Sequence, residues 1–277
     1  MKYAYFPGCK IPDHLPEYDI ATRAVLDRLG VRLVDLEFNC CGYPVRHQSF
    51  EASVLSGARN LAIARKEHLT IVTPCKCCFG NLKHVEYWMK QRPVLREKIN
   101  KMLAKEGLKW DNDIRVIHLL TLLAEDVGED EIKPKIVNPL KKLKVAPHYG
   151  CHALRPGEVV QFDNPLTPTI FEKLIQLTGA KSVDWPLRLE CCGNPLWEKN
   201  NRLSIKLMNK KLRDASESGA DIMATACTYC QIQFEQVRRN LPEDKQKNPE
   251  LEAVLYVQIL GSALGLGGFD LDFKKSK

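Results

Sequence analysis

Ten of the eleven cysteines in this chain of 277 residues form one spacing pattern that occurs twice. Each copy has a single cysteine after a glycine, then two adjacent cysteines followed by Gly-x-Pro, then a Cys-x-x-Cys pair. The first set is Cys9, Cys40, Cys41, Cys75 and Cys78, and the second is Cys151, Cys191, Cys192, Cys227 and Cys230. Clustered thiolates are preferred ligands of soft metals and iron–sulfur clusters. The duplication therefore predicts two metal-binding sites in two repeated halves.

The spacing favours a multi-iron cluster over a single zinc ion. A structural zinc site takes four ligands, often from two Cys-x-x-Cys pairs, and each half here has one such pair. Two adjacent cysteines diverge in extended backbone, so they reach different atoms of a larger object more readily than one tetrahedral ion. We favour an iron–sulfur cluster in each half. A zinc site and a purely thiol-based redox site are the alternatives.

The composition is that of an ordinary globular protein, with 44% hydrophobic and 27% charged residues. The length suits two domains of about 130–140 residues. Such a chain needs no disulfides, and an odd number of cysteines leaves one unpaired, so we expect free thiols in a reducing cytoplasm. Neither a signal peptide nor a membrane-spanning segment is expected. The net charge of +7 comes without a basic stripe interleaved with aromatics, so nucleic-acid binding is not indicated.

Short apolar runs alternate with helix-period segments in the same order in both halves. We predict strands over residues 3–6, 31–36, 70–73, 115–118, 145–148, 181–184, 221–225 and 255–257. We predict helices over residues 18–29, 50–66, 79–90, 119–124, 169–177, 201–218, 229–239 and 258–264. This alternation predicts an α/β fold of two pseudo-repeated parallel-sheet domains. We expect the domains at residues 1–138 and 139–277, with a linker over 127–143.

Every group of cysteines follows a predicted strand. The single cysteine follows the first strand of its half, the adjacent pair follows the second, and the Cys-x-x-Cys pair follows the third. The carboxyl ends of parallel strands meet at one edge of a sheet, where α/β proteins build their sites. We therefore expect one cluster at this edge of each sheet. Helices beginning after Cys78 and Cys230 would point positive amide ends toward the thiolates.

The arrangement Cys-x30-Cys-Cys-x33-Cys-x-x-Cys, with its second copy Cys-x39-Cys-Cys-x34-Cys-x-x-Cys, resembles the duplicated CCG-type cysteine-rich domain found in the catalytic B subunit of heterodisulfide reductase and its relatives. The resemblance implies that each five-cysteine set holds a noncubane [4Fe–4S] cluster. It implies an oxidoreductase acting on sulfur groups, which reduces or forms a disulfide substrate between the two clusters. It also implies two partners, the iron–sulfur C subunit and the flavin-bearing A subunit of such a complex. We expect no flavin or nucleotide on this chain, because it has no dinucleotide fingerprint.

Several residues near the cysteines are further candidates. His152 directly follows Cys151 and is the candidate proton donor to a leaving thiolate. A hydrogen bond from this imidazole to a cluster sulfur is the alternative. His148 ends a predicted strand, and we expect it to be structural. Lys76 and Arg155 could balance the charge of a cluster or substrate.

The eleventh cysteine, Cys77, stands where relatives with this motif commonly carry a glycine. A spare buried thiol, a reactive thiol and an alternative ligand are the three interpretations. The Gly-Tyr-Pro and Gly-Asn-Pro loops after the cysteine pairs differ from the sequences of methanogen enzymes, so the identity of the disulfide stays unassigned.

Two other functions compete with disulfide chemistry. One is an electron-transfer protein that passes electrons to a quinone or a partner dehydrogenase, because CCG-type domains also occur beside dehydrogenases. The other is a zinc-stabilised interaction scaffold. Two complete cysteine sets facing a cleft favour catalysis over electron transfer, and metal analysis distinguishes both from the zinc scaffold.

Overall fold

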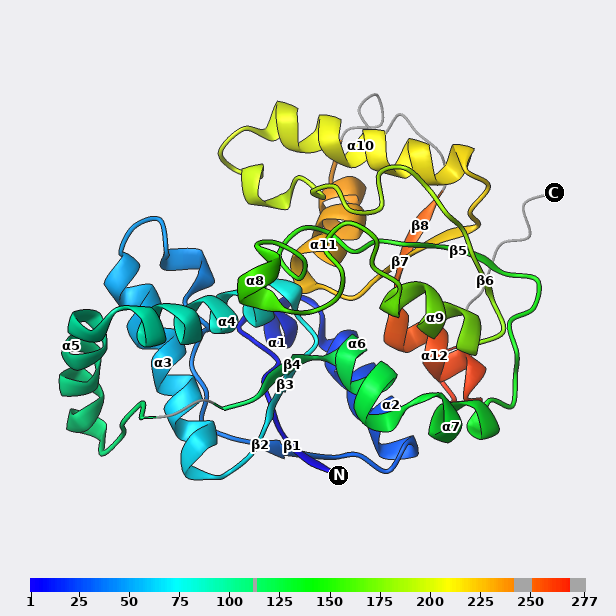
Figure 1. The fold of residues 1–277 in the computed structure, drawn as a ribbon. Helices are drawn as coiled ribbons and strands as arrows, with labels where there is room; N and C mark the ends of the chain where they lie inside the picture. Colours follow the sequence, from blue (N-terminus) through cyan, green and yellow to red (C-terminus); the bar gives the residue numbers. More distant parts are fainter. Residues whose placement is uncertain (112–113, 242–250, 270–277) are drawn as a thin grey trace.

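Two four-stranded sheets, one in each half of the chain, form the framework of the protein (Figure 1). The computed structural model describes residues 1–111, 114–241 and 251–269. The first sheet has the order β2-β1-β3-β4 and the second has the equivalent order β6-β5-β7-β8. Every neighbouring pair of strands is parallel. The expected α/β fold of two repeated halves is confirmed.

The strands are short and lie close to their predicted positions. They are β1 (Lys2–Tyr5), β2 (Arg32–Asp35), β3 (Ile71–Thr73), β4 (Val116–His118), β5 (Lys144–Pro147), β6 (Lys181–Ser182), β7 (Ile222–Thr225) and β8 (Glu252–Leu255). The central strands β3 and β7 are buried along their whole length. Their continuous apolar runs are typical of parallel strands covered on both faces.

Helices connect the strands and cover the sheets. In the first half these are α1 (Lys10–His14), α2 (Pro16–Arg28), α3 (Phe50–Lys66), α4 (Lys76–Gln91), α5 (Pro93–Leu103), α6 (Leu119–Thr121) and α7 (Glu129–Ile132). In the second half they are α8 (Gly157–Val160), α9 (Ile170–Leu177), α10 (Asn201–Glu217), α11 (Thr228–Ile232) and α12 (Tyr256–Ala263). π-Helical turns extend α6 over Leu122–Val127 and α11 over Gln233–Val237, and short 3₁₀ turns lie at Tyr43–Val45, Ala104–Glu106, Lys133–Lys135 and Asn194–Leu196. No helix within these described residues is both long and apolar enough to cross a bilayer.

Several elements differ from their prediction for local reasons. Helices α1 and α8 have only five and four residues, too few to show a helical period. Helix α5 was missed because Pro93 ends α4, yet proline is also well suited to the first position of a new helix. Strand β8 ends where the prediction placed its beginning, at Leu255, which caps α12. The predicted linker contains α7 and a 3₁₀ turn. The domain boundary after residue 138 stays a prediction.

The two halves meet at the carboxyl edges of both sheets. The buried His118 at the end of β4 places its Nε2 3.2 Å from the Pro74 carbonyl and 3.1 Å from the Ala226 carbonyl, so one ring contacts loops of both halves. Gly80 in α4 lies directly against the backbone of the second half, since a Cβ there would be 2.5 Å from the His152 carbonyl oxygen. Helix α12 also packs against α2. The cysteine-bearing edges therefore face each other across a closed seam.

The loops that follow the adjacent cysteines turn sharply against a helix in both halves. Gly42 and Gly193 have φ values of +91° and +94°. A Cβ would lie 2.4 Å from the Ser53 carbonyl oxygen at Gly42 and 2.6 Å from the Ser204 carbonyl oxygen at Gly193. Only glycine fits both the left-handed backbone and the close approach.

Replacing Gly193 by alanine should therefore destabilise the fold more than the same change at an open left-handed glycine. Gly219 is the matched control, with φ of +84° and nothing within 4 Å of the added Cβ. We expect Gly219→Ala to lower the free energy of unfolding by about 1–2 kcal/mol from backbone strain. Gly193→Ala should lose roughly a further 1–3 kcal/mol from overpacking. Urea unfolding followed by circular dichroism measures both, and equal losses would contradict the close packing.

Candidate metal centre

The structure places all ten cysteines of the pattern at the carboxyl edges of the two sheets, as predicted. Each single cysteine follows the first strand of its half, each adjacent pair follows the edge strand, and each Cys-x-x-Cys pair follows the central strand. Cys75 and Cys227 are the N-terminal caps of α4 and α11. The helices thus begin one residue after these cysteines, earlier than predicted, and direct their first amides toward the same edge.

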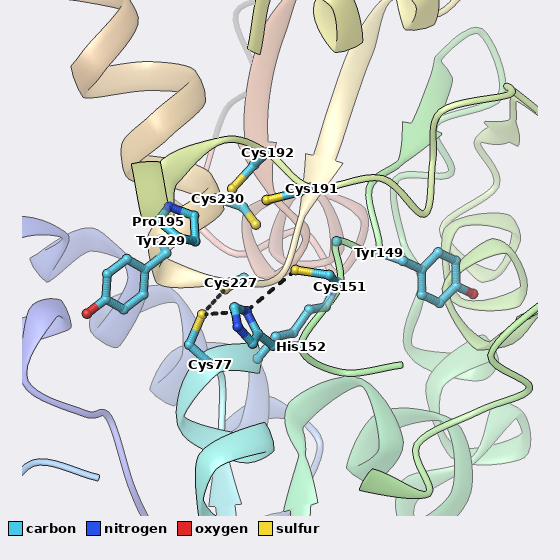
Figure 2. A pocket seen from close by; sticks show the side chains of 12 residues that line it. Cys77, Tyr149, Cys151, His152, Cys191, Cys192, Pro195, Cys227, Tyr229 and Cys230 are labelled. Carbon is cyan, nitrogen blue, oxygen red and sulfur yellow. Dashed lines mark hydrogen bonds between the residues drawn. The ribbon is translucent and has the colours of Figure 1, made fainter. Parts of the chain in front are cut away.

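The second set surrounds one pocket, which we call the second-half site (Figure 2). This pocket is lined by all five cysteines of the set. Its other lining residues are Lys76, Cys77, Tyr149, Gly150, His152, Pro195 and Tyr229.

The first set surrounds an equivalent pocket, the first-half site. Its lining residues are Pro7, Gly8, Cys9, Lys10, Cys41, Tyr43, Pro44, Cys75, Cys78, Thr228 and Tyr229. The fifth cysteine, Cys40, has its Sγ 3.7 Å from the Sγ of Cys9 and so belongs to the same group. Both five-cysteine sets predicted from the sequence therefore converge.

The donor chemistry of both pockets fits an iron–sulfur cluster. All eleven cysteines are free, and 3.7 Å between Cys9 and Cys40 is far beyond a disulfide bond of about 2.05 Å. Hydrogen bonding by Cys41 and then Cys9 lowers the pKa of Cys40, whereas interaction with Cys41 and Cys75 together with burial raises the pKa of Cys78. Neighbouring thiols thus oppose the joint ionisation of the group. Bound metal cations would relieve this repulsion, because metal binding requires and stabilises thiolates.

Backbone amides support the two partly exposed members of the adjacent pairs. The Gly42 amide donates to the Sγ of Cys40, and the Gly193 amide donates to the Sγ of Cys191, each over 3.4 Å. These bonds follow from the left-handed glycine turns. Hydrogen bonds of this kind orient ligand sulfurs and stabilise their negative charge.

The side chains between the two cysteines of each Cys-x-x-Cys pair line the pocket of the opposite half. Lys76 and Cys77, from the first half, line the second-half site, and Thr228 and Tyr229, from the second half, line the first-half site. The two sites therefore share a wall along the seam. Neither half contains all the residues that surround its own cysteines.

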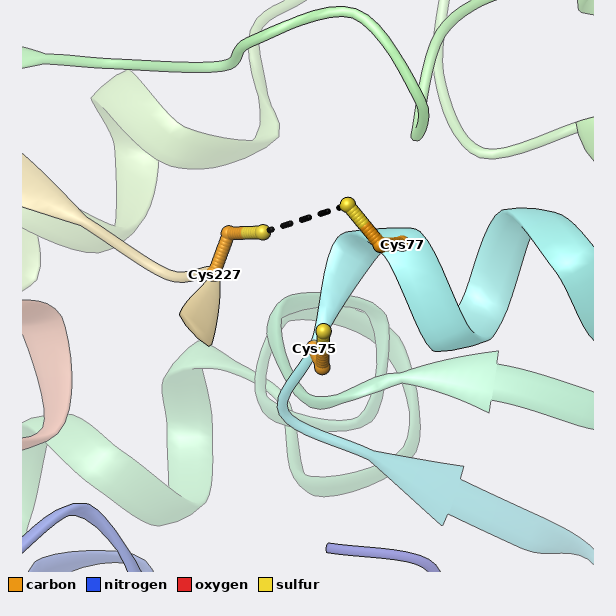
Figure 3. A group of neighbouring side chains, drawn as sticks. All are labelled: Cys75, Cys77 and Cys227. Atoms are coloured by element: carbon orange, nitrogen blue, oxygen red, sulfur yellow. Dashed lines mark hydrogen bonds between the residues drawn. The ribbon is translucent and has the colours of Figure 1, made fainter. Parts of the chain in front are cut away.

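Cys77 lies in this shared wall (Figure 3). It is buried, and its Sγ is 4.0 Å from the Sγ of Cys227 across the seam. The sulfurs of Cys75, Cys77 and Cys227 all lie within 4.8 Å of one another, so Cys77 contacts one member of each five-cysteine set. In the repeat it occupies the position of Tyr229, which explains why it falls outside the duplicated pattern.

His152 lies in the same wall. Its Nδ1 is 3.4 Å from the Sγ of Cys77 and 3.6 Å from the Sγ of Cys151 (Figure 2). The Tyr43 hydroxyl is 3.1 Å from its Nε2. Burial lowers the pKa of His152 and raises the pKa of Tyr43, so the imidazole is neutral and the phenol protonated near neutral pH. The geometry suits a Tyr43 hydroxyl that donates to Nε2 and an Nδ1–H that faces sulfur.

Two residues of the site were missed or misjudged from the sequence. His148 was expected to be structural, but its buried Nε2 is 3.2 Å from the Sγ of Cys230. Nothing in the sequence marks Lys211 as part of the site, yet its side chain is 2% exposed and interacts electrostatically with Cys192 and Cys230. Lys76 lines the pocket as suggested, whereas Arg155 is exposed and outside the lining. A lysine in a helix with several lysines gives no sequence signal of burial.

In the first half, the buried Asn60 of α3 holds the loop that carries the cysteine pair. Its Nδ2 donates to the carbonyls of Asn39 and Cys40, each over 3.2 Å, and its Oδ1 accepts from the Asn39 amide over 3.0 Å. This one side chain thus satisfies three backbone groups. It fixes the position of Cys40 relative to α3.

Asn60→Ala should consequently lower the free energy of unfolding by about 2–4 kcal/mol, because it removes three hydrogen bonds from a buried side chain to the loop backbone. Lys66→Ala on the exposed face of the same helix should change it by less than about 0.5 kcal/mol. Urea unfolding measures the difference. Similar stability of the two variants would show that Asn60 does not hold the loop.

Each α/β half directs five cysteines into a pocket at the carboxyl edge of its sheet. This arrangement defines a duplicated cysteine-rich, metal-binding protein. The chain belongs to the CCG cysteine-rich domain family, which matches residues 3–83 and 145–235. The resemblance predicted from the sequence is thereby confirmed, as is the class of iron–sulfur, metal-binding oxidoreductase subunits.

The chain is similar over nearly its full length to named proteins of this family. It is 29% identical over 280 residues, covering 99% of this chain and 93% of the relative, to the B subunit of the ferredoxin/F420H2-dependent CoB–CoM heterodisulfide reductase of Methanosarcina acetivorans. It is 31% identical over 276 residues, with 98% and 94% covered, to the 8-methylmenaquinol:fumarate reductase membrane anchor subunit of Wolinella succinogenes. It is 28% identical over 274 residues, with 96% and 91% covered, to a protein of Archaeoglobus profundus named as similar to the heterodisulfide reductase B subunit.

A solved structure shares the fold. The crystal structure of a hypothetical protein from Helicobacter pylori superimposes with a TM-score of 0.72 at 17% sequence identity. The match covers 95% of this chain and 49% of that chain, so this chain spans about half the length of that protein. At this identity the likeness concerns the fold alone.

Proposed function

We propose that this chain is the catalytic subunit of a heterodisulfide reductase-like complex, which reduces or forms a disulfide or related sulfur substrate. The ten patterned cysteines would hold two noncubane [4Fe–4S] clusters, five ligands to each. The iron–sulfur C subunit and the flavin-bearing A subunit of such a complex would be the partners, in a cytoplasm whose reducing conditions disfavour disulfides among the cysteines. The observation that carries the proposal is the convergence of two complete cysteine sets on pockets with a common wall.

Disulfide reduction converts one S–S bond, two electrons and two protons into two thiols. When bound, iron–sulfur clusters supply single electrons and Lewis-acidic iron for sulfur. This chain supplies the protons and the enclosure. The Nδ1–H of His152 faces sulfur at the seam and would pass its proton to a leaving thiolate while Nε2 takes a proton from the Tyr43 hydroxyl. Solvent would then reprotonate Tyr43, so the imidazole changes tautomer and is never left as an anion.

Aromatic rings restrict the access of water to His152 and the wall between the two pockets. Tyr43 packs edge-on against Tyr229 with ring centroids 5.5 Å apart, and against His152 at 4.9 Å. Tyr229 lines both pockets, so it separates the first-half site from the second-half site. A low-dielectric wall of this kind strengthens the electrostatic interactions of the groups that it encloses.

A second candidate function is supported by the relative from Wolinella succinogenes, whose name describes part of a menaquinol:fumarate reductase. An electron-transfer protein of this kind would pass electrons from the two clusters to a quinone or a partner protein. The two functions can be distinguished by adding oxidants to anaerobically purified, reduced protein. Oxidation of its clusters by small disulfides supports disulfide chemistry, whereas oxidation only by quinones or a partner protein supports electron transfer.

Metal analysis of the same material tests the basis of both functions. We expect iron and acid-labile sulfide in amounts that correspond to two four-iron clusters. Stoichiometric zinc without iron or sulfide would instead establish the zinc-stabilised scaffold and refute the proposal.

Cys192→Ala should remove the iron and sulfide of the second-half site and leave those of the first-half site. The physical reason is that Cys192 is a buried member of the second set only. The expected iron content is about half that of the unmodified protein, measured with the intensity of the cluster absorption. Retention of all the iron together with disulfide turnover would show that Cys192 is not a ligand.

His152→Gln should lower disulfide turnover by about 10²–10⁴-fold, the typical contribution of a positioned proton donor. Its cluster content should not change. His47→Gln, an exposed histidine outside both pocket linings, is the control and should turn over normally. Steady-state turnover at several pH values measures the effect, and an unchanged rate in His152→Gln would exclude the imidazole as the donor.

A further inference from the structure

Two buried lysines lie beside the second-half site. Lys76 and Lys211 are each only 2% exposed. The Lys76 ammonium donates to the His148 carbonyl over 3.0 Å and lies 5.0 Å from the centre of the Phe171 ring. The Lys211 ammonium donates to the Leu187 carbonyl and lies 4.6 Å from the centre of the Trp185 ring.

Neither charge has a carboxylate in direct contact among the described residues, although Glu172 acts on Lys76 and Glu190 on Lys211 at longer range. In the part of the chain that the structure describes, neither ammonium lies within 4.0 Å of an Asp or Glu oxygen. Burying an unpaired cation is costly, so a nearby negative charge must compensate it. Lys76 lines the second-half pocket together with all five cysteines of the set, and Lys211 interacts electrostatically with Cys192 and Cys230. The thiolates of this set therefore supply negative charge beside both lysines.

The first-half site has neutral side chains at both corresponding positions. A constant offset of 151 residues relates Cys40 to Cys191 and the first residue of α3, Phe50, to that of α10, Asn201. At this offset Lys211 corresponds to Asn60. Within the Cys-x-x-Cys pairs, Lys76 corresponds to Thr228.

Two further differences accompany the lysines. His148, whose Nε2 is 3.2 Å from the Sγ of Cys230, corresponds to Phe6, which has no polar group to offer. Lys10 lines the first-half site, but its contact with His14 is exposed to solvent, where water and salt screen a charge. Water near the exposed Cys9 also stabilises negative charge there, whereas the second-half site has two whole charges in buried surroundings, where the lower effective dielectric constant strengthens their interaction with sulfur.

From this asymmetry we infer that the second-half site stabilises added negative charge more strongly than the first-half site, and that Lys76 and Lys211 are the positioning residues responsible. The inference rests on the proposed function. The second-half cluster then has the higher reduction potential, because charge and hydrogen bonds to sulfur set cluster potentials. It is the electron-accepting end of the pair and the side on which an anionic thiolate product is held. The first-half cluster passes electrons to it.

Redox titration of single-site variants, monitored by electron paramagnetic resonance, tests this inference. Cys41→Ala removes a ligand of the first-half site and Cys192→Ala a ligand of the second-half site. We expect the cluster that remains in Cys41→Ala to have a more positive potential than the one that remains in Cys192→Ala. The unmodified protein should show two separate reduction steps, which requires no variant to fold.

Lysine substitutions then assign the cause. Lys211→Met and Lys76→Met should each lower the potential of the more positive reduction step, which belongs to the second-half cluster. Lys76→Arg, which keeps the positive charge, should leave that potential nearly unchanged. Lys210→Met is the matched control, since this neighbouring lysine on α10 is exposed and its removal should shift neither step.

Coincident potentials for the two sites, or an equal shift from Lys210→Met and Lys211→Met, would overturn the inference. Iron and sulfide present in full with coincident potentials would overturn the inference alone. Protein without iron would overturn the proposed function and the inference with it.

Discussion

Mutual repulsion among ten clustered thiolates is the constraint on which the rest of this structure depends. Thiols gathered in buried groups resist joint ionisation, and their surroundings must supply positive charge or hydrogen-bond donors. The fold meets this need at one edge of each parallel sheet, where amides of the glycine turns and the first turns of α4 and α11 are available. A sheet edge alone provides too little compensation for five thiolates. The sites are thus suited to bound metal cations, which these same thiolates would hold.

The duplication gives two similar sites, but the seam prevents them from being independent. Each half extends two side chains into the pocket of the other, and His118 contacts backbone carbonyls on both sides. Gly80 permits α4 to touch the backbone of the second half. Each half alone would expose Cys77 or Tyr229, together with part of its own cysteine set. The functional unit is therefore the pair of halves, even though each sheet is complete by itself.

Much of this arrangement could be predicted from the sequence, because cysteine spacing and strand–helix alternation are local signals. The pattern placed each cysteine group after the correct strand, and α3 was predicted with its observed bounds. The exchange of side chains across the seam could not be predicted, since it depends on how the two sheets face each other. The burial of Lys211 was equally hidden, because Lys210 beside it is exposed and the two are alike in sequence. His148 was misjudged because the end of a strand is usually a structural position.

In a duplicated fold, only the residues that differ between the two copies can give electron transfer between the two sites a preferred direction. Here the glycine turns and the ligand positions are nearly the same in both halves, so they treat the two sites alike. Three of the differences lie at buried positions of the second half: lysine for asparagine, lysine for threonine and histidine for phenylalanine. Each of these differences adds positive charge or a hydrogen-bond donor to the same side. The two halves have the same scaffold, but the electrostatic potential is more positive around the second-half site than around the first-half site. Electrons therefore move more readily toward the second-half site. Side chains that bind no metal determine this direction.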